Sequence, residues 1–246
     1  MEKEFTFINK LEGYYNLLDS HDYILTNFLN ESEQITIKNY FENRKIKVNF
    51  SYENTEFEMK RCVLSYYDQD IDFNIACFKI EYNKRFLELT HRNILGTLMH
   101  LGIKREMIGD IIIEDEIYIF VAKEISEFIK RNFISINNKP IELIYIENPK
   151  ISPKAEYISK TIFVETMRLD SIVAKGFNLS RETAKEMINL EMVKVNHIVN
   201  KNPTLKIKVD DLISLRKKGR IKVNDILGNS KSGKQRVELL CLKDNK

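Results

Sequence analysis

Basic, hydroxyl and amide side chains gather between residues 167 and 223 at spacings that suit contacts with phosphate groups. The candidate contacts are Arg168, Ser180, Arg181, Lys185, Lys194, Asn196, Arg216, Lys217, Lys218 and Arg220. An arginine offers two parallel N–H donors to phosphate oxygens, and a lysine offers a mobile point charge. Asparagine can donate and accept toward a ribose 2′-hydroxyl or a base edge. This set of residue types therefore indicates a surface for structured RNA.

Some of these positions also have a structural interpretation. Ser180 favours a helix-capping role that also orients the helix dipole. The neighbouring Asp170 favours pairing with an arginine over contact with RNA, and Lys217 and Lys218 could belong to a solvated loop. Arg181 and Lys194 are the strongest candidates for direct contacts, and we expect RNA binding to depend mainly on charged groups of this kind.

Two short helices and adjacent strands must position these side chains. The spacing of apolar residues predicts a first helix that begins near Arg168 and ends at Gly176, a glycine of the kind that caps helix C-termini. Ser180 predicts the N-cap of a second helix. Strands are expected over 192–195 and 209–215. A helix N-terminus presents free N–H groups, so the start of the second helix suits an anionic ligand.

This segment resembles the RNA-binding domain named after small-subunit ribosomal protein S-four. The matching residues are Arg-Leu-Asp at 168–170, Leu-Ser-Arg at 179–181, Ala-x-x-Met-Ile at 184–188 and Val-Lys-Val-Asn at 193–196. The family's Val-x-x-Gly-Asp step appears here as Val209-Asp210-Asp211, so an aspartate replaces the glycine. The resemblance covers about 60 residues. It implies an L-shaped basic surface, made of two helices and a strand, that contacts structured RNA.

The middle of the chain predicts a ferredoxin-like plait. Strand-forming residues, helical spacing and turns give the order strand, helix, strand, strand, helix, strand over residues 72–148. Such a plait is a four-stranded antiparallel sheet with both helices on one face. Tyr118 and Phe120 share one face of the third expected strand, where packing is favoured over stacking on RNA bases. Any RNA contact by this part is therefore expected to depend on charge and shape.

Residues 91–111, HRNILGTLMHLGIKREMIGDI, look like the central signature of the YlmH family of bacterial proteins. Members join an N-terminal region, a plait-like domain and a C-terminal S-four domain. The resemblance implies a non-catalytic protein that binds the large ribosomal subunit, or its peptidyl-tRNA complexes, in quality control of stalled nascent chains. Within the signature, Lys104 and Arg105 follow Gly102 and form a basic corner suited to phosphate.

We therefore expect an α+β chain with four parts. These are an N-terminal, mainly helical α+β region at 1–70, the plait at 71–150, a linker at 151–164, and an S-four-type domain with a C-terminal strand at 165–246. Two of the four prolines lie within 149–164, which favours the linker. The glycine- and lysine-rich run 228–234 is expected to be a flexible basic loop because no phosphate-binding helix follows it.

Charge is distributed unevenly along the chain. Residues 165–246 hold 18 Lys and Arg against 10 Asp and Glu, a net charge of +8, whereas residues 1–164 carry −5. A basic module joined to a mildly acidic body is typical of nucleic-acid-binding proteins. The alternative is a lysine-rich surface with no specific partner.

Several classes of protein are disfavoured. No apolar run approaches the roughly 18 residues of a membrane span, and the start of the chain does not read as a secretory signal. The three cysteines are unclustered, which suits a reducing cytoplasm and a chain without disulfides. His91 and His100 are too far apart for two ligands on one helix face. We expect no metal, no cofactor and no membrane partner, and we expect a monomer.

Two alternatives remain for the function. S-four domains often accompany pseudouridine synthases and methyltransferases, which need a catalytic aspartate in a much larger domain or a glycine-rich turn after a first strand. Residues 1–164 indicate neither, so we expect no enzymatic activity. A ribosome-assembly factor would share every feature described above.

Overall fold

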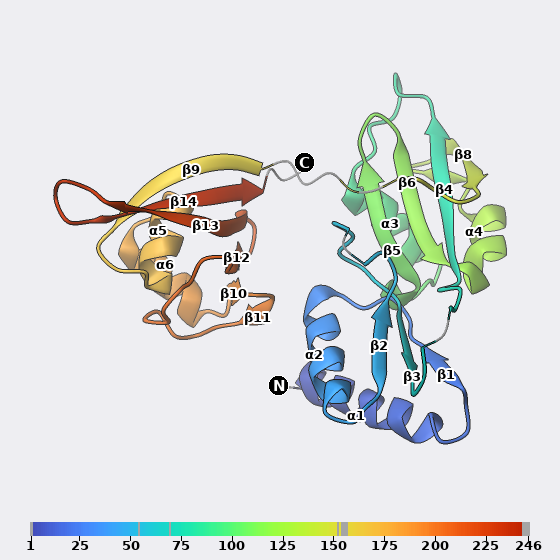
Figure 1. Cartoon of the computed structure of the whole chain (residues 1–246). Coiled ribbons are helices and arrows are strands. Elements are labelled where there is room, and N and C mark those ends of the chain that lie inside the picture. The colour runs from blue at the N-terminus through green and yellow to red at the C-terminus, as the bar shows by residue number, and fades with distance from the viewer. Residues whose placement is uncertain (1, 54, 69, 152, 154–156, 243–246) are drawn as a thin grey trace. The chain divides into compact units, whose positions relative to one another are not determined.

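The chain, seen in a computed structural model, is described at residues 2–53, 55–68, 70–151, 153 and 157–242. It folds into two compact units, residues 1–153 and 154–245 (Figure 1). Both units combine helices with antiparallel sheets, so the predicted α+β fold class is confirmed. No helix in the described part of the chain is long and apolar enough to cross a membrane.

Two helices and a three-stranded sheet form the start of the first unit. Leu11 of the first helix and Phe41 of the second pack against Leu64 in a common buried core. Asn30 caps the second helix, because its side chain accepts from the Glu33 N–H at 3.1 Å while the Glu33 carboxylate accepts from the Asn30 N–H at 2.8 Å. The elements are α1 (Glu2–Leu17), β1 (Tyr23–Leu25), α2 (Glu31–Glu42), β2 (Lys47–Phe50) and β3 (Cys62–Ser65).

The rest of the first unit is a five-stranded antiparallel sheet of order β5-β6-β4-β8-β7 with two helices on one face (Figure 1). Apart from the two-residue strand β7, this order and its connections are those of the predicted plait. The elements are β4 (Ile75–Tyr82), α3 (His91–His100), η1 (Arg105–Met107), β5 (Ile108–Ile113), β6 (Ile117–Ala122), η2 (Lys123–Ile125), α4 (Ser126–Asn132), β7 (Ser135–Ile136) and β8 (Lys139–Ile146).

The two faces of this sheet are covered differently. Ile119 of β6 is buried beneath α3 and α4. On the opposite face Phe120 is fully buried against Phe57, with ring centroids 4.9 Å apart, and Tyr52 stacks on Phe57 at 4.2 Å. The rings of Tyr52 and Phe57 come from the segment between β2 and β3. The prediction that Phe120 serves packing is therefore confirmed, and its ring cannot stack on a base in this conformation.

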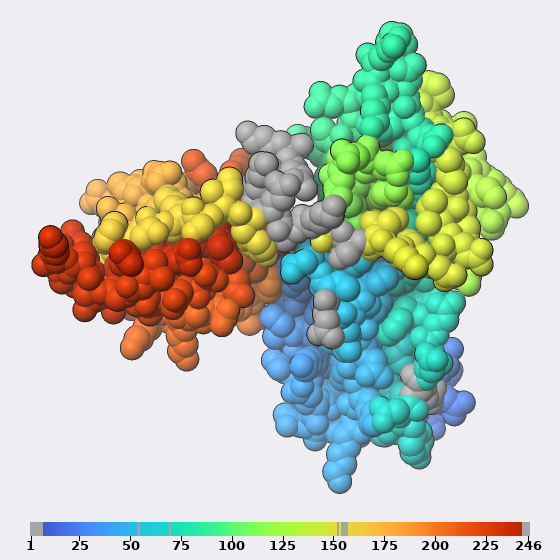
Figure 2. All heavy atoms as spheres, turned by 45° about the horizontal axis from the view of Figure 1, so that its top comes forward, coloured from blue at the N-terminus to red at the C-terminus, as the bar shows by residue number. Residues whose placement is uncertain are grey.

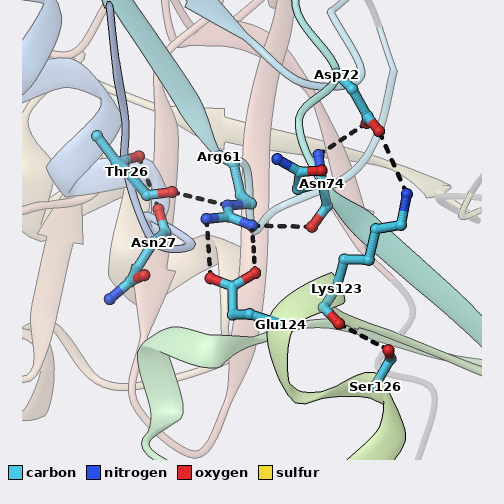
Figure 3. Close-up of polar contacts among 8 residues, drawn as sticks. All are labelled: Thr26, Asn27, Arg61, Asp72, Asn74, Lys123, Glu124 and Ser126. Carbon is cyan, nitrogen blue, oxygen red and sulfur yellow. Dashed lines mark hydrogen bonds and ion pairs between the residues drawn. The ribbon is translucent and has the colours of Figure 1, made fainter. Parts of the chain in front are cut away.

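Arg61 forms hydrogen bonds with both the N-terminal part of the first unit and the plait (Figure 3). Its side chain is only 4% exposed. The guanidinium donates to the Thr26 carbonyl at 2.8 Å and to the Asn74 carbonyl at 2.9 Å, and it also forms a two-fold contact with Glu124 at 3.2 and 3.3 Å. Thr26 follows β1, whereas Asn74 and Glu124 belong to the plait. One buried side chain thus satisfies polar groups from both parts.

We expect Arg61→Met to lower the free energy of unfolding of the full chain by about 2–4 kcal/mol, because two carbonyls lose their donor. Urea unfolding measures this change. The matched control is Arg131→Met, whose side chain is 78% exposed and lies 3.9 Å from Glu127. This exposed pair should change stability by less than about 0.5 kcal/mol. Equal effects of the two substitutions would contradict the role assigned to Arg61.

The second unit is a six-stranded antiparallel sheet of order β11-β10-β12-β13-β14-β9 with two short helices. Ile172 and Val173 of the first helix and Ile188 of the second are fully buried with residues of the sheet in one core. The elements are β9 (Tyr157–Val164), α5 (Leu169–Gly176), α6 (Arg181–Asn189), β10 (Val193–Val195), β11 (Ile198–Val199), β12 (Leu212–Leu215), β13 (Gly219–Asn229) and β14 (Gln235–Leu242).

The expected linker at 151–164 is wrong over its second half. Residues 157–164 form β9, which pairs with β14 along its whole length, from Tyr157 opposite Leu242 to Val164 opposite Gln235. Ile162 and Val164 are buried in the core of the second unit. The prolines and lysines of 149–154 favoured a linker over this whole segment. The partner strand also lies more than 70 residues further along the chain.

Gly176 has a different role from the predicted helix cap. It is the last residue of α5, and the left-handed conformation falls on Asn178, with φ of 55°. A Cβ atom at Gly176 would lie 2.4 Å from the Cδ1 atom of Ile221. The glycine therefore allows α5 to pack closely against β13, and the asparagine supplies the conformation that glycine usually supplies at a helix end.

Candidate nucleic-acid interface

Two arginines from the starts of α5 and α6 converge on one buried carboxylate. Arg168 precedes α5 and donates to Asp170 from Nε at 3.1 Å and from Nη2 at 2.9 Å. Arg181, the first residue of α6, donates to the same carboxylate from Nε at 3.2 Å and from Nη2 at 3.5 Å. Asp170 is 0% exposed, whereas the side chains of Arg168 and Arg181 are 34% and 50% exposed. The sequence indicated that Asp170 pairs with an arginine, and in the structure it pairs with two.

The charge of Asp170 is maintained by its partners. Burial alone would raise the pKa of Asp170, but hydrogen bonds and charges from Arg168 and Arg181 hold it below the usual value of an aspartate. The carboxylate in turn fixes two guanidinium groups whose remaining N–H donors can reach solvent. Arginine forks held in this way lose less conformational entropy when they bind a phosphate.

Helix α6 extends this basic surface. The Ser180 hydroxyl accepts from the Thr183 N–H at 3.0 Å, so Ser180 caps the helix as predicted. Lys185 is exposed one turn after Arg181, and the buried Ala184 and Ile188 face the core. Arg181 and Lys185 therefore lie on the exposed side of α6.

Strand β10 presents Lys194 to solvent between two inward-facing valines. Val193 and Val195 are buried, and Lys194 lies opposite Ser214 of β12. Asn196, which follows the strand, is already engaged: its amide donates to Asp211 at 2.8 Å, and its side-chain carbonyl accepts from the Leu212 N–H at 2.9 Å. Its side chain thus closes a turn, although its exposed position still permits contact with RNA.

The turn before β12 explains the departure from the family pattern. Asp210 has a φ of 72°, the left-handed region that favours glycine. Its carboxylate pairs with the Lys222 ammonium at 2.9 Å. An aspartate thus adopts here the conformation that glycine favours, and aspartate tolerates that conformation better than most residues.

Arg216, Lys217 and Lys218 form the exposed turn between β12 and β13. The Arg216 N–H donates to the Met192 carbonyl at 3.0 Å, which places this turn beside the start of β10. Arg220 lies partly buried in β13, opposite Ser214. The turn residues are therefore accessible, whereas Arg220 is more restricted.

Sequence reasoning missed two lysines near these elements. Lys206 is exposed and lies opposite Arg168 in an isolated antiparallel bridge. Lys160 of β9 donates at 2.8 Å to the carbonyls of Lys175 and Gly176 and to the Asn178 side chain, so it stabilises the end of α5. The alternation of Leu205, Lys206 and Ile207 was a signal for Lys206. No local pattern could reveal Lys160, because its partners are distant in sequence.

Lys104 and Arg105 belong to the first unit. Lys104 is exposed, whereas Arg105 is partly buried, donates to the Ile108 carbonyl, and has a pKa lowered by burial. Nearby, burial raises the pKa of Asp110 to about 7. Lys104 is thus accessible to a phosphate, and Arg105 is mainly engaged with its own chain.

Comparisons with known proteins agree with this architecture. The family described as "Putative RNA-binding domain in YlmH" matches residues 68–150, and the "S4 domain" family matches residues 167–213. The "Ribosome-associated protein quality control protein P2" of Bacillus subtilis (strain 168) is 28% identical over 185 residues, which are 73% of this chain and 72% of the relative.

A solved structure is also similar. The "Cell division protein ylmH from Streptococcus pneumoniae" has a TM-score of 0.52 and 26% identity to this chain, and the match covers 60% of this chain and 93% of that one. Together, the fold, the basic surface and the two domain matches define an RNA-binding protein that carries an S-four domain. Within this class, the two domain matches, the curated relative and the solved structure support a protein of the YlmH family.

Proposed function

We propose that this chain is a non-catalytic protein that binds structured ribosomal RNA or tRNA on the large ribosomal subunit, as a cytoplasmic monomer. Its role would be ribosome-associated quality control of stalled nascent chains. The name of the Bacillus subtilis relative supports the quality-control role. The observation that carries RNA binding is the pair of arginines held on the buried Asp170, beside the exposed Lys185 on α6.

The chemistry of this surface suits binding better than catalysis. Arg168, Arg181, Lys185 and Lys194 are all hydrogen-bond donors, and the carboxylate that the two arginines share is buried and doubly paired. A phosphate that displaces water from these groups would receive charge-assisted hydrogen bonds. Such contacts position an RNA without reading its sequence, which fits recognition of a folded RNA by shape.

Sedimentation in sucrose gradients tests the proposal. The purified full chain, mixed with ribosomes and separated subunits at low salt, is expected to migrate with the large subunit and to dissociate progressively as salt rises. Retention at the top of the gradient at low salt would contradict ribosome binding. Migration only with incompletely assembled particles from cells would favour an assembly factor instead.

A further inference from the structure

The last two strands of the second unit form a basic ribbon whose tip is free of carboxylates. Residues 226–236 contain Lys231, Lys234 and Arg236 and no Asp or Glu. All three side chains are exposed at or next to the tip of the β13–β14 hairpin. None of them forms an ion pair within the described part of the chain. Figure 1 shows that this hairpin extends past α5 and α6, and Figure 2 shows its red tip at the outer end of the unit.

The turn at the ribbon tip, within the run 228–234 expected to be a flexible basic loop, forms hydrogen bonds of its own. The Ser230 N–H donates to the Lys234 carbonyl at 2.7 Å, and the Gly233 N–H donates to the Ser230 carbonyl at 2.9 Å. The Lys234 N–H also donates to the Ser230 hydroxyl at 3.1 Å. Gly228 and Gly233, with φ of 94° and 79°, provide the conformations that bend the ribbon and close the turn. Lys231 and Lys234 are therefore carried by a hydrogen-bonded turn.

An aromatic ring lies beside these charges. Arg236 of β14 is directly opposite Phe163 of β9, so the two side chains project from the same face of the sheet. Phe163 is 46% exposed, so its ring is accessible on this face. Cations next to an exposed aromatic ring suit RNA, because phosphates bind the cations and an unpaired base can stack on the ring.

This ribbon lies outside the part of the chain that matches the S-four family. That match ends at residue 213, before β13 begins at Gly219. The strands β13, β14 and β9 thus enlarge the sheet beyond the matched part and carry a second group of cations on a rigid support. We propose that the β13–β14 tip is a second RNA contact, formed by Lys231, Lys234 and Arg236 with Phe163, which binds the backbone and an unpaired base of the same structured RNA.

This inference rests on the proposed RNA-binding function, and a salt titration tests it separately. The full-chain variant Lys231→Gln/Lys234→Gln/Arg236→Gln is compared with the wild type for binding to a labelled RNA stem-loop. We expect roughly 10- to 100-fold weaker binding at about 0.1 M salt. The slope of log affinity against log salt should become shallower by about 2 to 3, since each lost phosphate contact contributes about 0.9.

The control removes the same types of charge from the first unit, with Lys38→Gln, Lys130→Gln and Arg131→Gln, and should leave affinity and slope near the wild-type values. The tip variant could match the wild type in affinity and in salt slope while Arg181→Ala/Lys194→Ala weakens binding. In that case the ribbon is not an RNA contact, and the proposed function stands. If the tip variant binds the stem-loop normally but loses large subunits, the ribbon contacts a protein. A wild type that fails to bind any RNA overturns the proposed function itself.

Discussion

The double variant Arg181→Ala/Lys194→Ala is expected to bind structured RNA roughly 30- to 1000-fold more weakly than the wild type, a loss of about 2–4 kcal/mol. Each side chain provides a charge-assisted contact to phosphate of about 1–3 kcal/mol. The fold should survive, because Arg168 still pairs with the buried Asp170 and Lys194 is exposed between two core valines.

Titration of a labelled RNA stem-loop measures this loss, and circular dichroism during heating shows whether the variant still unfolds in a single cooperative transition. The matched control is Lys38→Ala/Arg131→Ala, which removes one lysine and one arginine from exposed helix pairs of the first unit. It should bind within about threefold of the wild type, because a charge that makes no contact with the RNA acts only through screened electrostatics. Equal losses in both variants would mean that net charge alone governs binding.

Removal of both arginines around Asp170 is expected to destabilise the second unit by about 3–5 kcal/mol at pH 7. The variant Arg168→Ala/Arg181→Ala leaves a fully buried carboxylate with only the Ser171 hydroxyl, at 3.4 Å, as a side-chain partner. In the wild type the lowered pKa of Asp170 contributes stability above its unfolded pKa, and this contribution is lost as the pH falls through the folded pKa. In the variant, burial without partners should instead raise the pKa.

The destabilisation should therefore begin to shrink as the pH falls through the raised pKa of Asp170 in the variant, and should be smallest well below about 4, where Asp170 is protonated in the unfolded chain as well. Urea unfolding at neutral and acidic pH measures the difference. A third substitution, Asp170→Asn, removes the buried charge and should restore part of the stability at neutral pH. If the loss is independent of pH and the asparagine restores nothing, the arginines stabilise the unit through packing and not through Asp170.

Local patterns were sufficient for most of the fold. The plait followed from the order of its elements, and the starts of α5 and α6 followed from Arg168 and the cap residue Ser180. Strand β9 was missed although six of its eight residues are β-branched or aromatic strand formers, and its partner β14 lies at the other end of the unit. Gly176 was misinterpreted for a similar reason, since only the approach of Ile221 shows why a side chain is excluded there.

The residue types of the candidate site could be predicted from the sequence, but most of their hydrogen-bond and ion-pair partners could not. The sequence indicated that Asp170 pairs with one arginine, but the convergence of Arg168 and Arg181 depends on how two helix starts meet. The hydrogen bonds of Asn196 to Asp211 and Leu212 likewise depend on a turn between strands distant in sequence. Which of the exposed cations touch RNA remains a prediction.

Ultraviolet cross-linking of the full chain to RNA, followed by mass spectrometry of the cross-linked peptides, tests the central claim most directly. The purified protein is bound to large ribosomal subunits at low salt, irradiated, and digested with protease and ribonuclease. The account predicts nucleotide adducts on peptides that contain residues 168–194, with fewer adducts as salt rises. Adducts confined to the first unit, with none in residues 157–242, would contradict it.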